Sequence, residues 1–184
     1  LNSIDCLAMQ SEQDKKRVIE LGANSEKVLN LGNTKFDQNY SSISENKKED
    51  YKSKFKISKD NLVFVAGSTH ANEEKNLIQI YKNLKTKFPE LYFIVAPRDI
   101  ERAAEIADLF QKNNIDYIKK SELKSESPEK IDALILNTIG ELAQIYSLAD
   151  LVFVGGSMMG KGGHNILEPA AHGKLVFFGP DMSN

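Results

Sequence analysis

Short apolar runs rich in β-branched and aromatic residues alternate with longer amphipathic segments over the last two thirds of the chain. The apolar runs predict six buried strands, at residues 62–66, 92–96, 116–118, 133–136, 150–154 and 174–178. Segments between them, most clearly 72–88 and 100–110, keep apolar positions at helical spacing. The alternation predicts an α/β fold, a doubly wound parallel sheet with flanking helices and ligands at the carboxyl ends of its strands.

The first sixty residues follow a different pattern. Residues 5–10 and 27–31 predict two short strands, joined by a helix that begins at Ser11 and ends near Gly22. Residues 38–61 are polar until Tyr51, and predict a linker followed by an amphipathic connecting helix. We therefore divide the chain at this linker, into residues 1–37 and 62–184.

Residues 150–179 carry the strongest signal for chemistry. Two apolar strands enclose a loop with five glycines and a segment at 164–172 that predicts a helix, with Asn165 as its cap. Such a loop brings backbone N–H groups close to an anion, and Glu168 in the first helical turn is suited to sugar hydroxyls, which predicts a nucleotide site. In the alternative interpretation the glycines only form a tight connection and Glu168 only complements the helix dipole. Lys161 is followed by glycine rather than Ser or Thr, so the loop is not a P-loop.

Other candidates follow the earlier strands. The hydroxyls of Ser68 and Thr69 suit phosphate or sugar, although both residues are equally suited to capping the next helix. Arg98, after Pro97, is placed to hold an anion with its planar fork. Gly140 permits a close approach to a ligand, and Glu141 is either a ligand contact or only an acid in a first helical turn.

Composition narrows the class of protein. Hydrophobic residues make up 41% of the chain and charged residues 27%, which is enough for a buried core. A formal charge of -2 and a pI near 6.0 exclude nucleic-acid binding as the main function. The single cysteine, Cys6, cannot form an internal disulfide, and nothing indicates a metal site. No run is long and apolar enough to span a bilayer, and because the sequence lacks an initial Met we expect a fragment.

The motif GGSxxxxGGHNxLEPAAHGKxVxFGP at 155–180 closely resembles the signature region of the Kdo transferases. These inverting glycosyltransferase-B enzymes move 3-deoxy-D-manno-oct-2-ulosonic acid (Kdo) from CMP-Kdo onto lipid A precursors. LGNTKFD at 31–37, AGSTH at 66–70, PR at 97–98 and NTIGEL at 137–142 match in the same order. The resemblance implies that residues 1–37 are the tail of an N-terminal acceptor domain and the crossover from it. Residues 62–184 are then a nucleotide-sugar donor-binding domain, truncated at its C-terminus.

The resemblance also implies roles for individual residues. Lys35 matches the lysine that stabilises charge on the departing phosphate, whereas the general-base glutamate belongs to a region that this chain does not contain. No cofactor is implied, and the fragment alone is expected to bind donor without turnover. Family enzymes commonly have histidine where this chain has Asp99. The contacts to CMP or Kdo are expected from Ser68, Thr69, Pro97, Arg98, Ile139, Gly140, Glu141, Gly163, His164, Asn165, Ile166, Leu167 and Glu168.

Three expectations remain open at this point. His164 is as much a structural candidate as a ligand, and His172 is expected to be structural. The fold also suits a nucleotide-sugar 2-epimerase acting on a UDP-sugar, or a non-catalytic nucleotide-binding domain. The resemblance alone implies that the parent protein lies at the cytoplasmic face of the bacterial inner membrane and receives its lipid acceptor through the missing domain, while the fragment is soluble.

Overall fold

The computed structural model describes residues 1, 3–33, 43–124 and 131–183. The chain separates into two compact units, Leu1–Tyr40 and Ser41–Asn184. Lys35 and most of the turn that carries it lie outside the described residues, so its role stays a prediction. The division of the chain into acceptor-domain tail, linker and donor domain also stays a prediction.

The first unit contains the two strands and the helix that the sequence predicts. Strand β1 (Leu7–Met9) pairs in parallel with β2 (Val28–Asn30), and α1 (Glu12–Glu20) and the short 3-10 helix η1 (Ser25–Lys27) connect them. Ser11 caps α1, because its hydroxyl accepts a hydrogen bond from the backbone N–H of Asp14.

The second unit contains the larger sheet, and all six strands lie close to their predicted positions. They are β3 (Leu62–Thr69), β4 (Leu91–Pro97), β5 (Tyr117–Lys119), β6 (Ala133–Ile135), β7 (Leu151–Val154) and β8 (Leu175–Phe178). The α-helices are α2 (Glu45–Lys54), α3 (Glu73–Lys85), α4 (Ala103–Lys112), α5 (Leu142–Ile145) and α6 (Leu167–Ala171). The 3-10 turns are η3 (Ile100–Arg102), η4 (Lys120–Glu122) and η5 (Tyr146–Leu148).

Every pairing in the larger sheet is parallel, and the strand order is β5-β6-β4-β3-β7-β8. The chain builds outward from β3 through β4 to the β6 and β5 edge, then crosses to the other side of β3 to form β7 and β8. This reversal beside β3 is the topological switch point at which doubly wound sheets bind ligands. The predicted fold class is confirmed.

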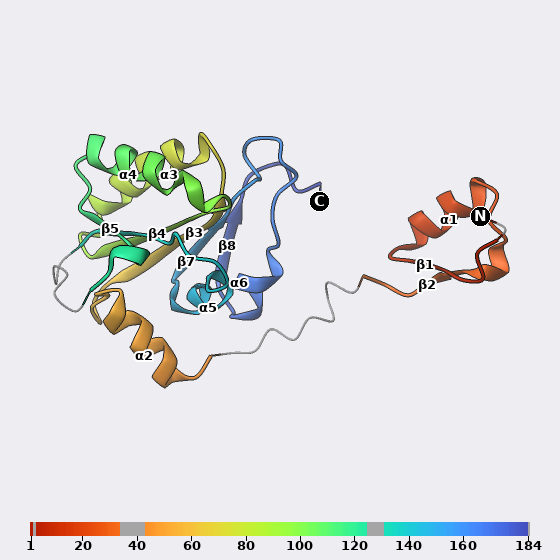
Figure 1. Cartoon of the computed structure of the whole chain (residues 1–184), viewed down its shortest axis with the longest axis horizontal. Helices are drawn as coiled ribbons and strands as arrows, with labels where there is room; N and C mark the ends of the chain where they lie inside the picture. The colour runs from red at the N-terminus through yellow and green to blue at the C-terminus, as the bar shows by residue number, and fades with distance from the viewer. Residues whose placement is uncertain (2, 34–42, 125–130, 184) are drawn as a thin grey trace. The chain divides into compact units, whose positions relative to one another are not determined.

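Helices cover the two faces of this sheet in separate groups (Figure 1). On one face, α3 and α4 pack against a core that includes Phe64, Phe93 and Phe110. On the other face, α2, α5 and η5 pack against a core that includes Phe55 and Tyr146, and Ile166 at the start of α6 packs against the same core. Because each strand of the centre is buried on both sides, its sequence reads as a continuous apolar run.

Two polar contacts fix helices within this core. The hydroxyl of Tyr92 on β4 donates a hydrogen bond to the carbonyl of Phe55, at 2.7 Å, and so holds the end of α2 against the sheet. Between α3 and α4, the guanidinium of Arg102 donates to both carboxylate oxygens of Glu74, at 2.6 and 3.3 Å. The Glu74 side chain is only 1% exposed, so this pair neutralises a buried charge.

No helix in the described part of the chain combines the length and the apolar character that crossing a membrane requires.

Candidate functional site

The residues that follow β3, β4 and β7 meet at the switch point of the larger sheet. Strand β3 ends with Ser68 and Thr69, and His70 follows it. Arg98 follows β4, and a glycine-rich loop (residues 155–163) leads from β7 to His164. Parallel pairing brings these segments to one edge, because the carboxyl ends of neighbouring parallel strands lie together. The segments that carry several of the candidate residues therefore lie close together.

The end of β3 is irregular at Ser68. Its φ of 54° lies in the left-handed region, and the pairing with β4 shifts register there, so that Thr69 lies opposite Pro97. The side chain of Thr69 is 0% exposed, and its hydroxyl has no hydrogen-bond partner among the described residues. The capping alternative does not hold for either residue, since the residue at the start of α3 is Asn72. Ligand contacts by Ser68 and Thr69 remain predictions.

Arg98 is exposed at the mouth of the switch point. Its backbone N–H donates to the carbonyl of Thr69 at 2.9 Å, which fixes the Arg98 backbone against β3. Burial lowers the pKa of His164 and raises the pKa of Glu168, and the positive charge of Arg98 adds to the first shift and opposes the second. Asp99 stands where family enzymes commonly have histidine. Its side chain accepts a hydrogen bond from the backbone of Glu101 and caps η3. The role of Arg98 as an anion ligand stays a prediction.

The glycine-rich loop is held by two carboxylates of the chain itself. Glu73, 0% exposed at the start of α3, accepts hydrogen bonds from the backbone of His70 and Gly156, both at 2.9 Å, and from Met158 at 3.1 Å. Asp181 accepts a further bond from Gly162 at 2.9 Å. Glycine is required at the base of this loop, because a Cβ on Gly155 would collide with the backbone carbonyl of Ser68 and lie 2.7 Å from the Cα of Thr69.

We expected this loop to offer unpaired backbone N–H groups to an anion. For most of the loop this expectation is wrong, because the N–H groups already have partners within the chain. Besides the bonds to Glu73 and Asp181, Gly163 donates to the carbonyl of Gly156 at 3.0 Å, and His164 donates to the carbonyl of Gly155 at 3.1 Å. A loop closed on itself in this way presents side chains rather than backbone donors. The sequence does not reveal this, because it does not show which carboxylates approach the loop.

The predicted helix after the loop begins later than expected. Residues 164–166 are not helical, and α6 spans only Leu167–Ala171. Asn165 still acts near its start, because its side chain accepts a hydrogen bond from the backbone of Leu167 at 2.9 Å. At the other end, His172 contacts the carbonyl of Ala143 on α5 through Nε2, at 2.8 Å. The prediction that His172 is structural agrees with this contact between two helices.

Glu168 lies half-buried in the first turn of α6, near Arg98. Burial raises the pKa of Glu168, while the hydrogen bond from Asn165 and the charges of Arg98 and His172 act in the opposite direction. Burial raises the pKa of the nearby Tyr146, and the charge of Glu168 adds to that increase. A carboxylate that is partly shielded from water accepts hydrogen bonds more strongly than an exposed one, which is the property that a ribose ligand needs.

Residues 139–141 lie after β6. Ile139 is 82% exposed, and Gly140 has a φ of 88° with open space where a Cβ would be. Glu141 accepts a hydrogen bond from Thr138 at 2.6 Å and pairs with Lys120 at 2.9 Å. Burial alone would raise the pKa of Glu141, but these two hydrogen bonds and the Lys120 charge outweigh it, so the pKa is lowered.

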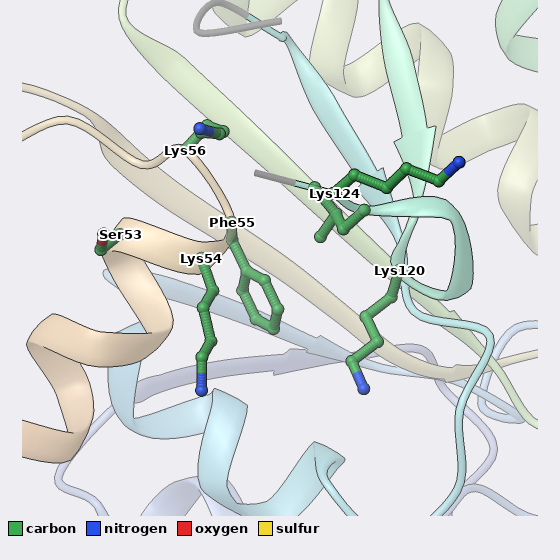
Figure 2. A pocket seen from close by; sticks show the side chains of 7 residues that line it. Ser53, Lys54, Phe55, Lys56, Lys120 and Lys124 are labelled. Atoms are coloured by element: carbon green, nitrogen blue, oxygen red, sulfur yellow. The ribbon is translucent and has the colours of Figure 1, made fainter. Parts of the chain in front are cut away.

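A cavity of about 620 Å³ lies between the end of α2 and the segment that contains η4. Figure 2 shows Lys54 and Lys56 at one wall, Lys120 and Lys124 at the other, and the ring of Phe55 between them. Lys54 pairs with the carboxylate of Asp50 at 2.7 Å, and Lys120 pairs with Glu141, which reduces the positive charge of the cavity. We place the candidate site at the switch point, because none of the predicted ligand residues lines this cavity.

Two side chains at the switch point were not among the predicted site residues. One is Glu73, whose role depends on a loop more than eighty residues away in sequence. The other is His70, whose Nε2 lies 2.7 Å from Nε2 of His164. The AGSTH motif contains His70 and was the available signal for it. Among the described residues, no group of three or more His, Cys, Asp or Glu side chains is arranged to hold a metal ion.

Comparison with known proteins finds similar glycosyltransferases. Residues 1–38 match the family model for 3-deoxy-D-manno-octulosonic-acid transferase (kdotransferase). A bifunctional glycosyltransferase/methyltransferase of Fusobacterium nucleatum is 39% identical to this chain. The match covers the whole of this chain and 28% of that protein. The 3-deoxy-D-manno-octulosonic acid transferase of Chlamydophila psittaci is 36% identical to this chain. That match covers 98% of this chain and 41% of the transferase. The chain thus spans less than half the length of these curated relatives.

Solved structures show the same fold. The C-terminal CMP-Kdo binding domain of WaaA from Acinetobacter baumannii superposes with a TM-score of 0.68 and 28% identity, over 76% of this chain and 72% of that one. UDP-GlcNAc 2-epimerase from Neisseria meningitidis superposes with a TM-score of 0.51 over 94% of this chain and 42% of that one, and its 16% identity shows the fold alone. The larger unit is therefore the Rossmann-like half of a glycosyltransferase-B fold. Within that class, the chain is a relative of the Kdo transferases, as its motifs indicated.

Proposed function

We propose that this chain is the donor-binding half of an inverting glycosyltransferase that transfers Kdo from CMP-Kdo to a lipid A precursor in lipopolysaccharide biosynthesis. The observation that carries the proposal is the meeting of Arg98, His164 and Glu168 at the switch point. The likeness to a CMP-Kdo binding domain supports the choice of donor. The lipid acceptor and the inner-membrane location are assigned through the relatives' family rather than through this site.

In this proposal, three groups of residues bind different parts of the donor. Arg98 donates its paired N–H groups to the phosphate of CMP, since its exposed guanidinium lies near both other side chains. Glu168 accepts hydrogen bonds from the ribose hydroxyls. The open Gly140 and the exposed Ile139 contact the CMP moiety from the neighbouring strand end, where the Lys120 pair positions Glu141.

The proposed chemistry is attack by an acceptor hydroxyl on the anomeric carbon of Kdo. The new glycosidic bond forms as the bond to the CMP phosphate breaks, and the configuration inverts. Arg98 and Lys35 stabilise the negative charge that the phosphate gains. A glutamate outside these 184 residues takes the hydroxyl proton, so we expect this chain alone to bind donor without transfer.

Calorimetric titration of the chain with CMP and with UMP tests the assignment. We expect CMP to bind preferentially, and Arg98→Ala to weaken CMP binding about tenfold to a hundredfold, the range for losing a charged hydrogen bond. Arg17→Ala, which changes an exposed arginine on α1, is the matched control and should leave affinity unchanged. Binding of UMP without CMP would instead favour the uridine-nucleotide donor of an epimerase. Equal affinity of the Arg98→Ala variant and the unmodified chain would contradict the site.

A further inference from the structure

Two imidazoles face each other at the switch point. His70 follows β3 and His164 ends the glycine-rich loop, 94 residues later. Their Nε2 atoms are 2.7 Å apart, their ring centroids 5.0 Å apart, and their planes differ by 7°. The difference between the two distances, 2.3 Å, is about the sum of two ring radii. The rings therefore lie end to end in nearly one plane, with the nitrogens pointing at each other.

This geometry determines the protonation of the pair. Two imidazole nitrogens approach to 2.7 Å only when one carries a hydrogen and the other accepts it. If both rings were fully protonated, two N–H groups and two positive charges would oppose each other. The pair therefore holds a single proton between its Nε2 atoms, and the accepting ring is neutral with its other proton on Nδ1.

The surroundings of the pair disfavour a positive charge on His164 while no ligand is present. Burial lowers the pKa of His164, the charges of His70 and Arg98 lower it further, and only Glu73 acts in the opposite direction. The Glu73 carboxylate already accepts three backbone hydrogen bonds, one of them from His70 itself. An anion placed beside Arg98 would reverse this balance, because it offsets the arginine charge and attracts a positive charge on the nearby rings.

We propose that His70 joins His164 as a donor-binding residue, and that the histidine pair takes up one proton when the acidic group of the donor binds beside Arg98. This inference rests on the proposed function and extends it, since it adds a binding residue and predicts proton-coupled binding. After uptake, the N–H···N bond between the rings persists, each ring carries a proton on Nδ1, and the pair has one added positive charge. The anion is a phosphate or a sugar carboxylate, and the test separates these two sources.

The chain contains three histidines, which makes the test direct. Proton uptake is measured by titrating CMP calorimetrically in buffers of different ionisation enthalpy, between about pH 6 and about pH 8, where imidazoles titrate. We expect uptake approaching one proton per CMP and a CMP affinity that falls up to tenfold for each unit of rising pH. Cytidine, which lacks the phosphate, and free Kdo, which carries only a carboxylate, show which acidic group causes the uptake.

Substitutions assign the proton to the pair. His70→Gln should reduce uptake and weaken CMP binding, and the double variant His70→Gln/His164→Gln should abolish uptake. His172→Gln, which changes the third ring at its contact with Ala143, is the control and should bind and take up protons as before. The proton of the CMP phosphate, with a pKa of about 6, contributes equally in all variants.

Side-chain NMR of labelled histidine supplies a readout that does not depend on affinity. The pKa of His164 should rise when CMP saturates the site, and the imidazole signals of His172 should not respond to CMP. Binding of CMP and of free Kdo with no proton uptake from either, or with uptake that persists in the double variant, would overturn the histidine-pair inference and leave the proposed function intact. Absence of CMP binding to the unmodified chain would overturn both.

Discussion

The buried carboxylate of Glu73 should be the main determinant of the glycine-rich loop's conformation. Glu73→Gln keeps the shape of the side chain but changes its donors and acceptors. The amide oxygen replaces Oε2 and keeps the bonds from His70 and Gly156, each weakened by about 1 kcal/mol because a neutral acceptor replaces a charged one. The amide NH₂ replaces Oε1 and faces the N–H of Met158, which leaves a donor unpaired at a cost of about 1–3 kcal/mol.

Relief from burying a charge offsets part of this loss, so we expect Glu73→Gln to destabilise the chain by about 3 kcal/mol. For a domain of this size, that corresponds to a melting temperature lower by roughly 6–12 °C. Thermal and urea unfolding followed by circular dichroism measure the change. The control is Glu105→Gln, which removes an exposed partner of Arg102 and should change stability by less than about 0.5 kcal/mol. If the two substitutions have equal effects, Glu73 does not hold the loop.

Three further predictions concern stability around the site. Arg102→Ala leaves its buried carboxylate partner on α3 unpaired, so the free energy of unfolding measured in urea should fall by about 3–5 kcal/mol. A fall below about 1 kcal/mol would refute the importance of the pair. Gly163→Ala should destabilise the chain more than Gly160→Ala, because both have positive φ but only the Cβ at 163 meets the C-terminal segment; equal melting temperatures would show that this segment yields. Glu168→Gln should raise the melting temperature near pH 7 while weakening CMP binding. The raised folded-state pKa of this acid makes stability fall as pH rises through it, so the gain from Glu168→Gln should disappear below about pH 4, where the unfolded acid is also protonated.

The strands and the long helices were predictable because each depends on local pattern. Buried parallel strands such as β3 and β4 need apolar side chains on both faces, so their runs are visible without any knowledge of their neighbours. Helix α3 shows its apolar spacing in the same way. The short helix α6 was placed too early, because its start depends on how residues 164–166 are held by the loop rather than on helix propensity.

Some features of the candidate site were likewise predictable from local sequence, and others were not. Arg98, Glu168 and the glycine-rich loop were found from residue type and position at strand ends, and the structure brings the segments that carry them to one edge of the sheet. The loop's hydrogen bonds were not predictable, because Glu73 and Asp181 reach it from α3 and from the C-terminal segment. The contact between His70 and His164 likewise joins two motifs whose distance in sequence gives no sign that their rings meet.

The sequence by itself determined the parallel α/β architecture, the order of its elements and the relationship to Kdo transferases. Periodicity and motif spacing encode these properties directly in neighbouring residues. Only the tertiary structure decided which groups remain available to a ligand. Hydrogen-bond donors and charges are satisfied by whatever lies beside them in space, so the closed glycine-rich loop and the paired histidines follow from the folding of distant segments against one another.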